Sequence, residues 1–368
     1  MGQALDKITI RGFKSIQELN DFELTNLNVL IGGNGAGKSN FVEIFRMLRA
    51  MVDQNFGNYI ITRGGADDFM FNGPQITSYI DAQFEFGKNS YTFELEPTPS
   101  GNFLIRHEKQ RYLDYDWQTI AANQVESQLY QIKDEKSVRG NWYGVGHHVY
   151  KSISGWTVYH FHDTSDKAPM RRYEIIQDIG KLRADAANIA PFLLSLKTND
   201  YIAYTNILDT VRLVIPFFND FVLTSIFRGE KEVVNLSWTQ KGSDYPMQPY
   251  HLSDGSIRFI CLATALLQPA PPSTIIIDEP ELGLHPFAIA ILAELIQATA
   301  TKTQVIISTQ SPALVDYFLP ENVIVVNREN GASTFNRLDG DHLTEWLDDY
   351  SLGELWQKNV VSGGPVHE

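Results

Sequence analysis

Apolar and polar residues alternate in several short segments of the chain. The alternation covers residues 7–10, 79–86 and 91–95, and a period of two is typical of strands with one buried face. Turn-forming residues, Gly-Lys-Asn-Ser, separate the last two segments, and Pro-Thr-Pro-Ser-Gly follows them. This spacing predicts an antiparallel β meander between residues 76 and 106.

A second pattern places apolar residues three and four positions apart, which predicts helices at 41–52, 189–218, 256–267 and 287–298. Short apolar runs predict buried strands at 27–31, 274–277, 304–307 and 323–326. Because strands and helices alternate after residue 250, we expect a doubly wound sheet. The expected fold class is α/β, with a mixed, mostly parallel sheet, an antiparallel β meander and an inserted helical lobe.

The order of these elements suggests four units. Residues 1–60 and 250–335 are expected to form one core lobe that contains the parallel sheet. Residues 61–165 would supply the meander and a variable insertion, residues 166–250 a helical lobe, and residues 336–368 an acidic C-terminal segment. The sequence shows no sustained heptads, so we do not expect a long coiled-coil arm.

The strand expected at 27–31 runs directly into a glycine-rich loop and then into a helix. Residues 32–39, Gly-Gly-Asn-Gly-Ala-Gly-Lys-Ser, match the pattern G-x-x-x-x-G-K-[ST] in the context that this pattern requires. Glycine lets successive backbone N–H groups surround a phosphate, and the helix N-terminus adds a positive end. We therefore expect ATP to bind through Gly32, Asn34, Gly35, Ala36, Gly37, Lys38, Ser39 and Asn40.

Two adjacent carboxylates follow the apolar strand at 274–277. Asp278 would hold Mg²⁺ together with Ser39, mainly through water, and Glu279 would polarise the water that attacks the γ-phosphate. Lys38 would reach the β- and γ-phosphate oxygens. An isolated Asp-Glu pair before proline is more often a solvated strand end, but the phosphate-loop pattern in the same chain favours the catalytic interpretation.

Three separated motifs together resemble the ABC-type ATPase heads of the SMC, RecF and OLD groups. They are the phosphate loop, the run Asp-Glu-Pro-Glu-Leu-Gly-Leu-His-Pro at 278–286, and His-Leu-Ser-Asp-Gly-Ser at 251–256. The resemblance implies the fold of a P-loop ATPase head, with ATP and Mg²⁺ as cofactors. It also implies a homodimer in which two heads sandwich two ATP molecules.

In such heads a signature loop acts across the dimer. The resemblance implies that Ser253 and Gly255 of one subunit close on the ATP bound to the other. It further implies that residues 281–286 face the dimer partner and that residues 9–15 are the opening strand beside the adenine. Judged without the resemblance, Ser253 before Asp-Gly is more often a helix N-cap.

One position departs from the pattern of this family. These ATPases usually carry a histidine after the strand that follows the Asp-Glu pair, whereas this chain has Gln310 within Ser-Thr-Gln-Ser-Pro. Glutamine can donate a hydrogen bond to a γ-phosphate, but it cannot carry a charge or transfer a proton. We expect Gln310 to act in catalysis with Glu279 and Lys38, and hydrolysis to be slow.

The residue that senses the metal and the γ-phosphate is left open by the sequence. Related heads usually supply a glutamine, and Gln83 and Asp163 are both candidates here. His160 and His162 alternate on an expected strand, which would place both rings on one face. A zinc site at these histidines is disfavoured, because structural zinc sites normally use cysteine and the single cysteine, Cys261, lies elsewhere.

Charge limits the classes of partner. The chain has 30 Lys+Arg against 44 Asp+Glu, a formal net charge of −14, which excludes the overall basic surface of a dedicated nucleic-acid coat. A cluster of Arg171, Arg172, Lys181 and Arg183 could still touch a phosphate backbone, although a solvated surface is the favoured interpretation. Residues 339–356 contain several acidic residues and two tryptophans. This segment could be either a docking surface or a terminal helix packed on the core.

Three further segments, at 159–163, 168–172 and 349–356, resemble a subgroup of stand-alone bacterial ATPases often encoded beside a second protein in phage-defence clusters. The leading hypothesis is an ATP-dependent homodimeric switch that controls such a partner, with higher oligomers and nucleic-acid contacts left open. Because the chain lacks a secretory leader and an apolar run of about 20 residues, we expect a cytoplasmic protein without membrane contact.

Three alternatives stand beside this hypothesis: an OLD-type nuclease, the nucleotide-binding subunit of a transporter, and a nucleotide-dependent scaffold with little turnover. The stretch after Glu279 is shorter than an acidic, metal-binding nuclease domain, so we expect any nuclease activity to lie in another chain. The long insertion disfavours the transporter subunit. A steady-state ATPase assay separates the scaffold from the switch.

Overall fold

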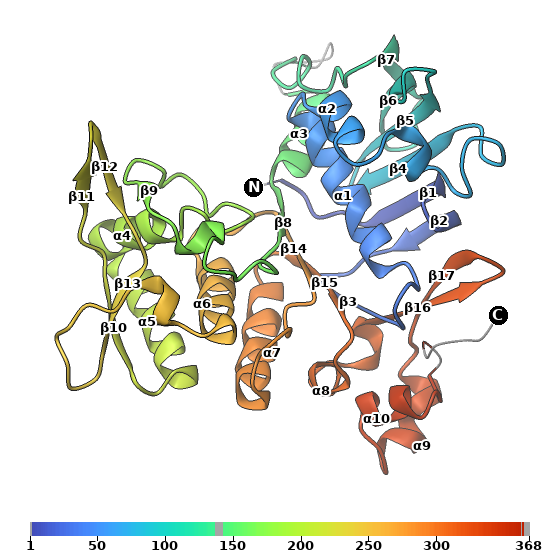
Figure 1. The fold of residues 1–368 in the computed structure, drawn as a ribbon. Helices are drawn as coiled ribbons and strands as arrows, with labels where there is room; N and C mark the ends of the chain where they lie inside the picture. Colours follow the sequence, from blue (N-terminus) through green and yellow to red (C-terminus); the bar gives the residue numbers. More distant parts are fainter. Residues whose placement is uncertain (1, 137–142, 362, 364–368) are drawn as a thin grey trace.

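A six-stranded sheet forms the centre of the chain in a computed structural model that describes residues 2–136, 143–361 and 363. The strand order is β17-β16-β3-β15-β14-β8, and neighbouring strands are parallel except for β16 and β17 (Figure 1). The strands are β3 (Leu27–Ile31), β8 (Trp156–Tyr159), β14 (Thr274–Asp278), β15 (Gln304–Thr309), β16 (Val323–Glu329) and β17 (Ala332–Arg337).

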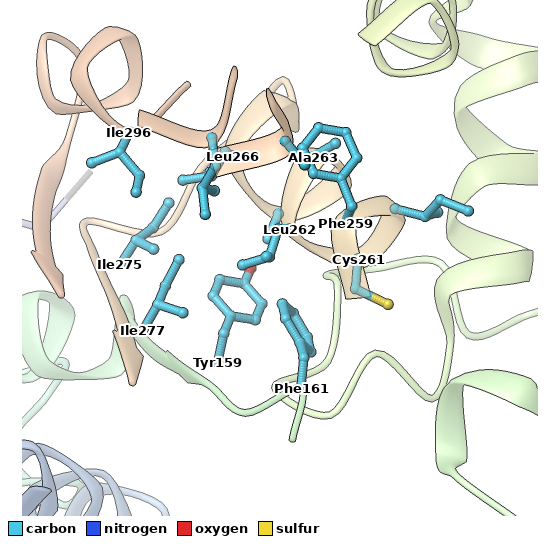
Figure 2. Packing of buried hydrophobic residues seen from close by; sticks show 14 of the residues in the cluster. Tyr159, Phe161, Phe259, Cys261, Leu262, Ala263, Leu266, Ile275, Ile277 and Ile296 are labelled. Atoms are coloured by element: carbon cyan, nitrogen blue, oxygen red, sulfur yellow. The ribbon is translucent and has the colours of Figure 1, made fainter. Parts of the chain in front are cut away.

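Helices cover both faces of this sheet because its central strands are buried on both sides. Helix α1 (Lys38–Val52) packs with Leu30, Ile276 and Ile306 in one hydrophobic cluster. Helices α6 (Asp254–Leu267) and α7 (Pro286–Ala300) pack with the alternate strand residues in another. Figure 2 shows part of the second cluster, in which Ile275 and Ile277 lie near Leu262 of α6. The expected α/β class with a doubly wound sheet is confirmed.

A second six-stranded sheet is antiparallel, in the order β2-β1-β4-β5-β6-β7. Its strands are β1 (Lys7–Phe13), β2 (Ile16–Glu23), β4 (Ile80–Phe86), β5 (Asn89–Pro97), β6 (Phe103–Tyr112) and β7 (Gln118–Gln124). Alternate residues of β4 are buried, as its period-two pattern predicts. Strand β1 pairs with β2 and β4, so the N-terminal strand belongs to the antiparallel sheet. Its expected place in the core lobe would instead suggest the parallel sheet.

The helical lobe contains two helices, α4 (Ile189–Asn199) and α5 (Tyr201–Val214), and two small sheets. One sheet consists of β10 (Phe218–Val222) and β13 (Ser237–Gln240). The other consists of β9 (Glu174–Ile175), β11 (Ile226–Arg228) and β12 (Lys231–Val234). The residues predicted to be helical at 189–218 therefore form two helices, and the last of these residues is the first residue of β10. The break lies at Asp200, whose side chain caps α5 by accepting a hydrogen bond from the N–H of Ala203 (3.1 Å).

Residues 118–158, which show no clear pattern in the sequence, include α3 (Val145–Ser154) and β8. Strand β8 pairs with β14, so this part of the expected insertion completes the parallel sheet. The remaining helices are α2 (Phe56–Ile61), α8 (Pro312–Val315), α9 (Thr344–Leu347) and α10 (Leu352–Gln357), with 3₁₀ turns at Ala66–Phe69, Pro169–Arg171, Pro249–His251, Pro320–Asn322 and Asp341–Leu343.

The acidic C-terminal segment is partly packed and partly exposed. Leu352, Leu355 and Trp356 are buried in the core cluster, and the indole N–H of Trp356 donates to the carbonyl oxygen of Gly363 (3.1 Å). Trp346 is 48% exposed. Of the two interpretations of this segment, core packing holds for Trp356 and an exposed aromatic surface for Trp346. Across the described ranges, the helices are too short or too polar to cross a bilayer.

Candidate active site

The carboxyl ends of four parallel strands meet at one edge of the central sheet. Strand pairing brings the last residues of β3, β15, β14 and β8 side by side. The segments that follow these ends carry the phosphate loop, Gln310, Glu279 and His160, respectively. Open α/β sheets collect their site residues at this edge, so residues far apart in the sequence share one site here.

The phosphate loop lies tightly against the hairpin of β16 and β17 at two glycines. A Cβ at Gly32 would clash with the carbonyl oxygen of Val326, and a Cβ at Gly37 would clash with Oγ of Ser333. Gly37 also has φ 116°, a conformation that other residues rarely adopt. Close packing against the hairpin of β16 and β17 therefore requires glycine at positions 32 and 37.

Hydroxyl groups link the phosphate loop to two other elements. Oγ of Ser333 lies 2.6 Å from the carbonyl oxygen of Ala36 and 2.7 Å from Oγ of Ser15. The side-chain amide of Asn40 donates to the same Ser15 oxygen (2.7 Å). The turn after β1, the start of α1 and the β17 hairpin therefore support one loop conformation. Ser333 could not be identified from the sequence, because a serine in an edge strand carries no signal of its own.

Lys38 lies inside the loop, with its side chain nearly buried. Its ammonium donates hydrogen bonds to the carbonyl oxygens of Gly32 (2.6 Å) and Gly33 (3.1 Å). Burial lowers the pKa of this ammonium, and the nearby carboxylates of Glu279 and Asp278 act in the opposite direction. The lysine and the two acids therefore lie close enough to interact electrostatically.

Asp278 is fixed by neighbours on both sides of its strand. The hydroxyl of Ser308 donates to Oδ1 of its carboxylate, and Nε2 of His162 lies 2.9 Å from its backbone carbonyl oxygen. Ser308 is fully buried at the end of an apolar strand. That position, a polar residue ending a buried strand, is the sequence signal that could have identified Ser308 as part of the site.

Glu279 leaves the strand through an unusual backbone conformation. Its φ is 46°, in the left-handed region that non-glycine residues seldom occupy, and its N–H donates to the carbonyl oxygen of Ser308 (2.8 Å). Its carboxylate accepts a hydrogen bond from the side-chain amide of Gln310. Backbone conformations of this kind cluster at functional sites.

The residues at this edge fit a nucleotide with its divalent cation. The first N–H groups of α1 have no partner within the helix and face the loop, which provides donors for phosphate oxygens. Ser39 is exposed at the start of α1, and Asp278 supplies the carboxylate oxygen that Mg²⁺ prefers. The structure thus brings together Lys38, Asp278, Glu279 and Gln310, as the sequence analysis expects.

The two sensor candidates lie on different elements, Gln83 in β4 and Asp163 in the segment after β8. Gln83 lies on β4 of the antiparallel sheet, where its amide donates to Glu85 (2.9 Å). The Asp163 carboxylate accepts hydrogen bonds from Ser165. His160 and His162 follow β8 beside Asp278, with their ring centroids 4.9 Å apart. Strand β8 ends before both histidines. Among the described residues, three or more His, Cys, Asp or Glu side chains nowhere form a group that could hold a metal ion.

Ser253 is the N-cap of α6, on the face of the sheet opposite α1. Its Oγ accepts a hydrogen bond from the N–H of Ser256 (3.2 Å), as the simple capping interpretation predicts, and the residue is exposed. A Cβ at Gly255 would clash with the carbonyl oxygen of Gly283, so the signature loop touches the loop at 281–286. Capping leaves Ser253 accessible to a second subunit.

Of the four residues in the expected basic cluster, Arg171 is buried, whereas Arg172, Lys181 and Arg183 are exposed. Arg171 is 8% exposed and donates to the backbone carbonyl oxygens of Thr164 (2.9 Å), Leu252 (3.1 Å) and Pro249. Arg183 has ion pairs with Glu174, Asp178 and Asp185. Arg171 instead fixes the chain in front of Ser253, and the charge of Arg183 is largely compensated.

A polar pocket of about 340 Å³ adjoins the phosphate loop. It is lined by Lys14, Ser15, Asn40, Asp67, Asp68, Met70, Asn72, Arg328 and Gly331. Lys14 lies over the ring of Phe69, with Nζ 4.4 Å from the ring centroid, and burial lowers the pKa of its ammonium. The turn after β1 and the start of α1 therefore both supply walls of this pocket.

Comparison with solved structures shows the fold of SMC heads. The head of SMC bound to the C-winged helix domain of ScpA is 14% identical, with a TM-score of 0.61, over 93% of this chain and 99% of that chain. An SMC head with an extended coiled coil, bound to the C-terminal domain of ScpA from Pyrococcus furiosus, is 13% identical with a TM-score of 0.57, over 94% and 98% of the two chains.

Comparison of the sequence with protein families gives a match over most of the site. No curated protein matches the sequence significantly. Residues 27–316, from β3 to just beyond α8, match the family described as "AAA domain, putative AbiEii toxin, Type IV TA system". That span contains the phosphate loop, the Asp278–Glu279 strand end and Gln310. The chain therefore belongs to this AAA-domain family and has the α/β fold of an SMC-type ATPase head.

Proposed function

We propose that this protein is a slow ATPase that dimerises around two ATP molecules and thereby controls a partner protein. The observation that carries the proposal is the convergence of Lys38, Asp278, Glu279 and Gln310 at the carboxyl edge of one parallel sheet. Membership of an AAA-domain family and the fold of SMC heads support nucleotide binding.

The chemistry follows from the positions of the side chains. Lys38 would exchange its two carbonyl partners for the β- and γ-phosphate oxygens, which are better partners for a buried ammonium. Ser39 and Asp278 would hold Mg²⁺, which supplies charge neutralisation on the phosphates when it is bound. Glu279 would accept the proton of the attacking water. Gln310 donates to one oxygen of this carboxylate, so movement of its amide to the γ-phosphate would free that oxygen as well.

The polar pocket beside the loop is the place where we expect the base and ribose of ATP. It adjoins Asn40 at the start of α1, and residues 9–15 on its border are those that resemble the strand beside the adenine. Lys14 and Arg328 offer donors on its walls, and the planar guanidinium of Arg328 offers a flat packing surface.

A dimer would complete the site from outside. Ser253 is exposed at the N-terminus of α6, on the other face of the sheet from the phosphate loop, so a second subunit is the simplest source of a signature residue over the γ-phosphate. The related SMC heads were solved with a bound ScpA domain, which supports a partner protein for this chain as well. We propose that this partner is an effector, such as a nuclease or toxin of a bacterial defence system, encoded nearby.

Phosphate release by the purified protein tests the ATPase proposal. We expect Mg²⁺-dependent turnover below about one per second, loss of most turnover in Glu279→Gln, and loss of nucleotide binding in Lys38→Ala. Mant-ATP fluorescence, which measures binding separately, distinguishes the two variants. If the wild-type protein binds ATP but releases no phosphate, the scaffold alternative replaces the ATPase.

A further inference from the structure

Glu281 is a buried carboxylate for which the proposed chemistry has no use. Its Oε1 accepts two hydrogen bonds, from Oγ1 of Thr309 (2.7 Å) and from the backbone N–H of Gln310 (3.1 Å). Its Oε2 is buried and has no hydrogen-bond partner among the residues that the structure describes. Within those residues it is the one carboxylate oxygen in that situation.

An acid in this position is costly for the fold. Burying a carboxylate oxygen without a partner is unfavourable, and an apolar side chain of similar size would avoid that penalty. Burial raises the pKa of Glu281, whereas its hydrogen bonds with Thr309 and Gln310 act in the opposite direction. The Glu281 carboxyl group therefore stabilises the loop at 309–311, to which it is hydrogen-bonded, and is not a solvated surface acid.

Hydrogen bonds to Oε1 of Glu281 and to Oγ1 of Thr309 hold the loop at 309–311 in place. Oγ1 of Thr309 donates to Glu281 and also accepts a hydrogen bond from the N–H of Ser311 (3.0 Å). Gln310 is held at two points: its backbone N–H by Glu281 and its side-chain amide by Glu279. Two acids in the segment after β14, Glu279 and Glu281, therefore hold Gln310, which directly follows β15.

The main chain after Glu281 is itself firmly placed. The guanidinium of Arg258 donates to the carbonyl oxygen of Leu282, and Gly283 lies against Gly255 at the start of α6. The N–H of Leu284 donates to the carbonyl oxygen of Glu281 (3.0 Å). Glu281 thus joins a fixed segment to the loop of Gln310.

We propose that Glu281 is a positioning residue for ATP hydrolysis, which holds the backbone of Gln310 in place while the Gln310 side chain moves from Glu279 to the nucleotide. The inference rests on the proposed ATPase function. The Gln310 amide donates to one oxygen of the Glu279 carboxylate, and turning the amide to the γ-phosphate frees that oxygen for a proton from water. The backbone hydrogen bond to Glu281 does not take part in that exchange, so it keeps Gln310 within reach of the γ-phosphate.

The test compares steady-state kcat and KM with mant-ATP affinity in a series of variants. Glu281→Ala removes both hydrogen bonds, and we expect kcat to fall by about 10- to 100-fold, as for a misplaced catalytic group, with ATP affinity within about threefold of wild type. Glu281→Gln keeps an oxygen that accepts the same two hydrogen bonds, so kcat should return to within about threefold. Thr309→Val, which removes one of the two donors, should give a smaller loss.

A purely structural role predicts a different result. In that case Glu281→Ala would lower thermal stability and ATP affinity together, and Glu281→Gln would not restore kcat selectively. If Glu281→Ala does not fold, Glu281→Asp provides the second test, because its shorter side chain cannot reach Gln310 and should lower kcat alone. Wild-type kcat in Glu281→Asp or Glu281→Ala overturns the inference. A wild-type protein without ATPase activity overturns the proposed function instead.

Discussion

The side-chain amide of Gln310 donates a hydrogen bond to the carboxylate of Glu279, across the ends of two neighbouring parallel strands. Gln310 therefore occupies one of the two oxygens of the carboxylate that we assign as the base. This hydrogen bond competes with any hydrogen bond from the same amide to the γ-phosphate. The arrangement gives a physical reason for a low basal rate, in addition to the missing proton-transfer ability of glutamine.

Gln310→His tests this relationship. A histidine can form a charge-assisted hydrogen bond to the γ-phosphate, and such a bond contributes about 1.5–3 kcal/mol. Because only the part realised in the transition state accelerates the reaction, we expect a modest rise in kcat, up to about tenfold. Phosphate release at saturating ATP measures it, with Gln310→Ala as the control that lacks any donor.

Two results would contradict the assignment of Gln310. A wild-type rate of many turnovers per second would mean that the Gln310–Glu279 hydrogen bond does not limit catalysis. Rates equal to wild type in both Gln310→His and Gln310→Ala would mean that Gln310 is structural.

Lys38→Ala is expected to weaken ATP binding strongly. The buried ammonium gives the phosphate loop its positive charge, and a charge-assisted hydrogen bond of about 1.5–3 kcal/mol corresponds to a loss of affinity of about 10- to 100-fold or more. Titration with mant-ATP measures the loss. Lys7→Ala, which removes an exposed lysine paired with Glu23, is the matched control and should bind as wild type does. Tight ATP binding by Lys38→Ala would argue against this loop as the nucleotide site.

Ser253→Arg tests the contribution of the second subunit. An arginine at this exposed N-cap should leave ATP binding by single subunits within about threefold of wild type but prevent closure of the dimer. Mixing Ser253→Arg with Lys38→Ala subunits should restore at most one of the two composite sites, and so at most about half of the wild-type rate. Hydrolysis at the wild-type rate by Ser253→Arg alone would show that Ser253 does not act across a dimer.

Arg171 is expected to stabilise the fold and not to contact nucleic acid. Arg171→Met leaves several buried carbonyl oxygens without a donor, so we expect the free energy of unfolding to fall by about 2–4 kcal/mol. Arg172→Met is the neighbouring control, since Arg172 is exposed, and should change stability by less than about 0.5 kcal/mol. Urea denaturation measures both. Equal stability of the two variants would contradict the structural role of Arg171.

The predictions from sequence succeed where a pattern depends on local spacing. The strand, loop and helix around residues 32–39 and the strand that ends at Asp278 follow from periodicity and one specific motif. The register that aligns β3, β15 and β14 could not be predicted, because strand order in a parallel sheet depends on packing between distant segments.

Long-range contacts also decide the residues that the sequence analysis misjudged or missed. Strand β1 joins the antiparallel sheet because β2 and β4 offer it two partners. Arg171 is counted with a basic cluster in the sequence, but in the fold it is turned inward to carbonyl groups near residue 250. In the sequence Glu281 is noticed only as the start of the segment 281–286 that is expected to face a dimer partner, since its contacts with Thr309 and Gln310 depend on the fold.

The oligomeric state of Glu279→Gln with ATP tests the central claim most directly. The amide keeps the shape of the carboxylate but cannot accept the proton from water, so ATP should stay bound and hold two subunits together. Size-exclusion chromatography with light scattering should show a monomer without nucleotide and a dimer with Mg²⁺-ATP. A monomer under both conditions, in the variant and in the wild type alike, would contradict the ATP-dependent dimer.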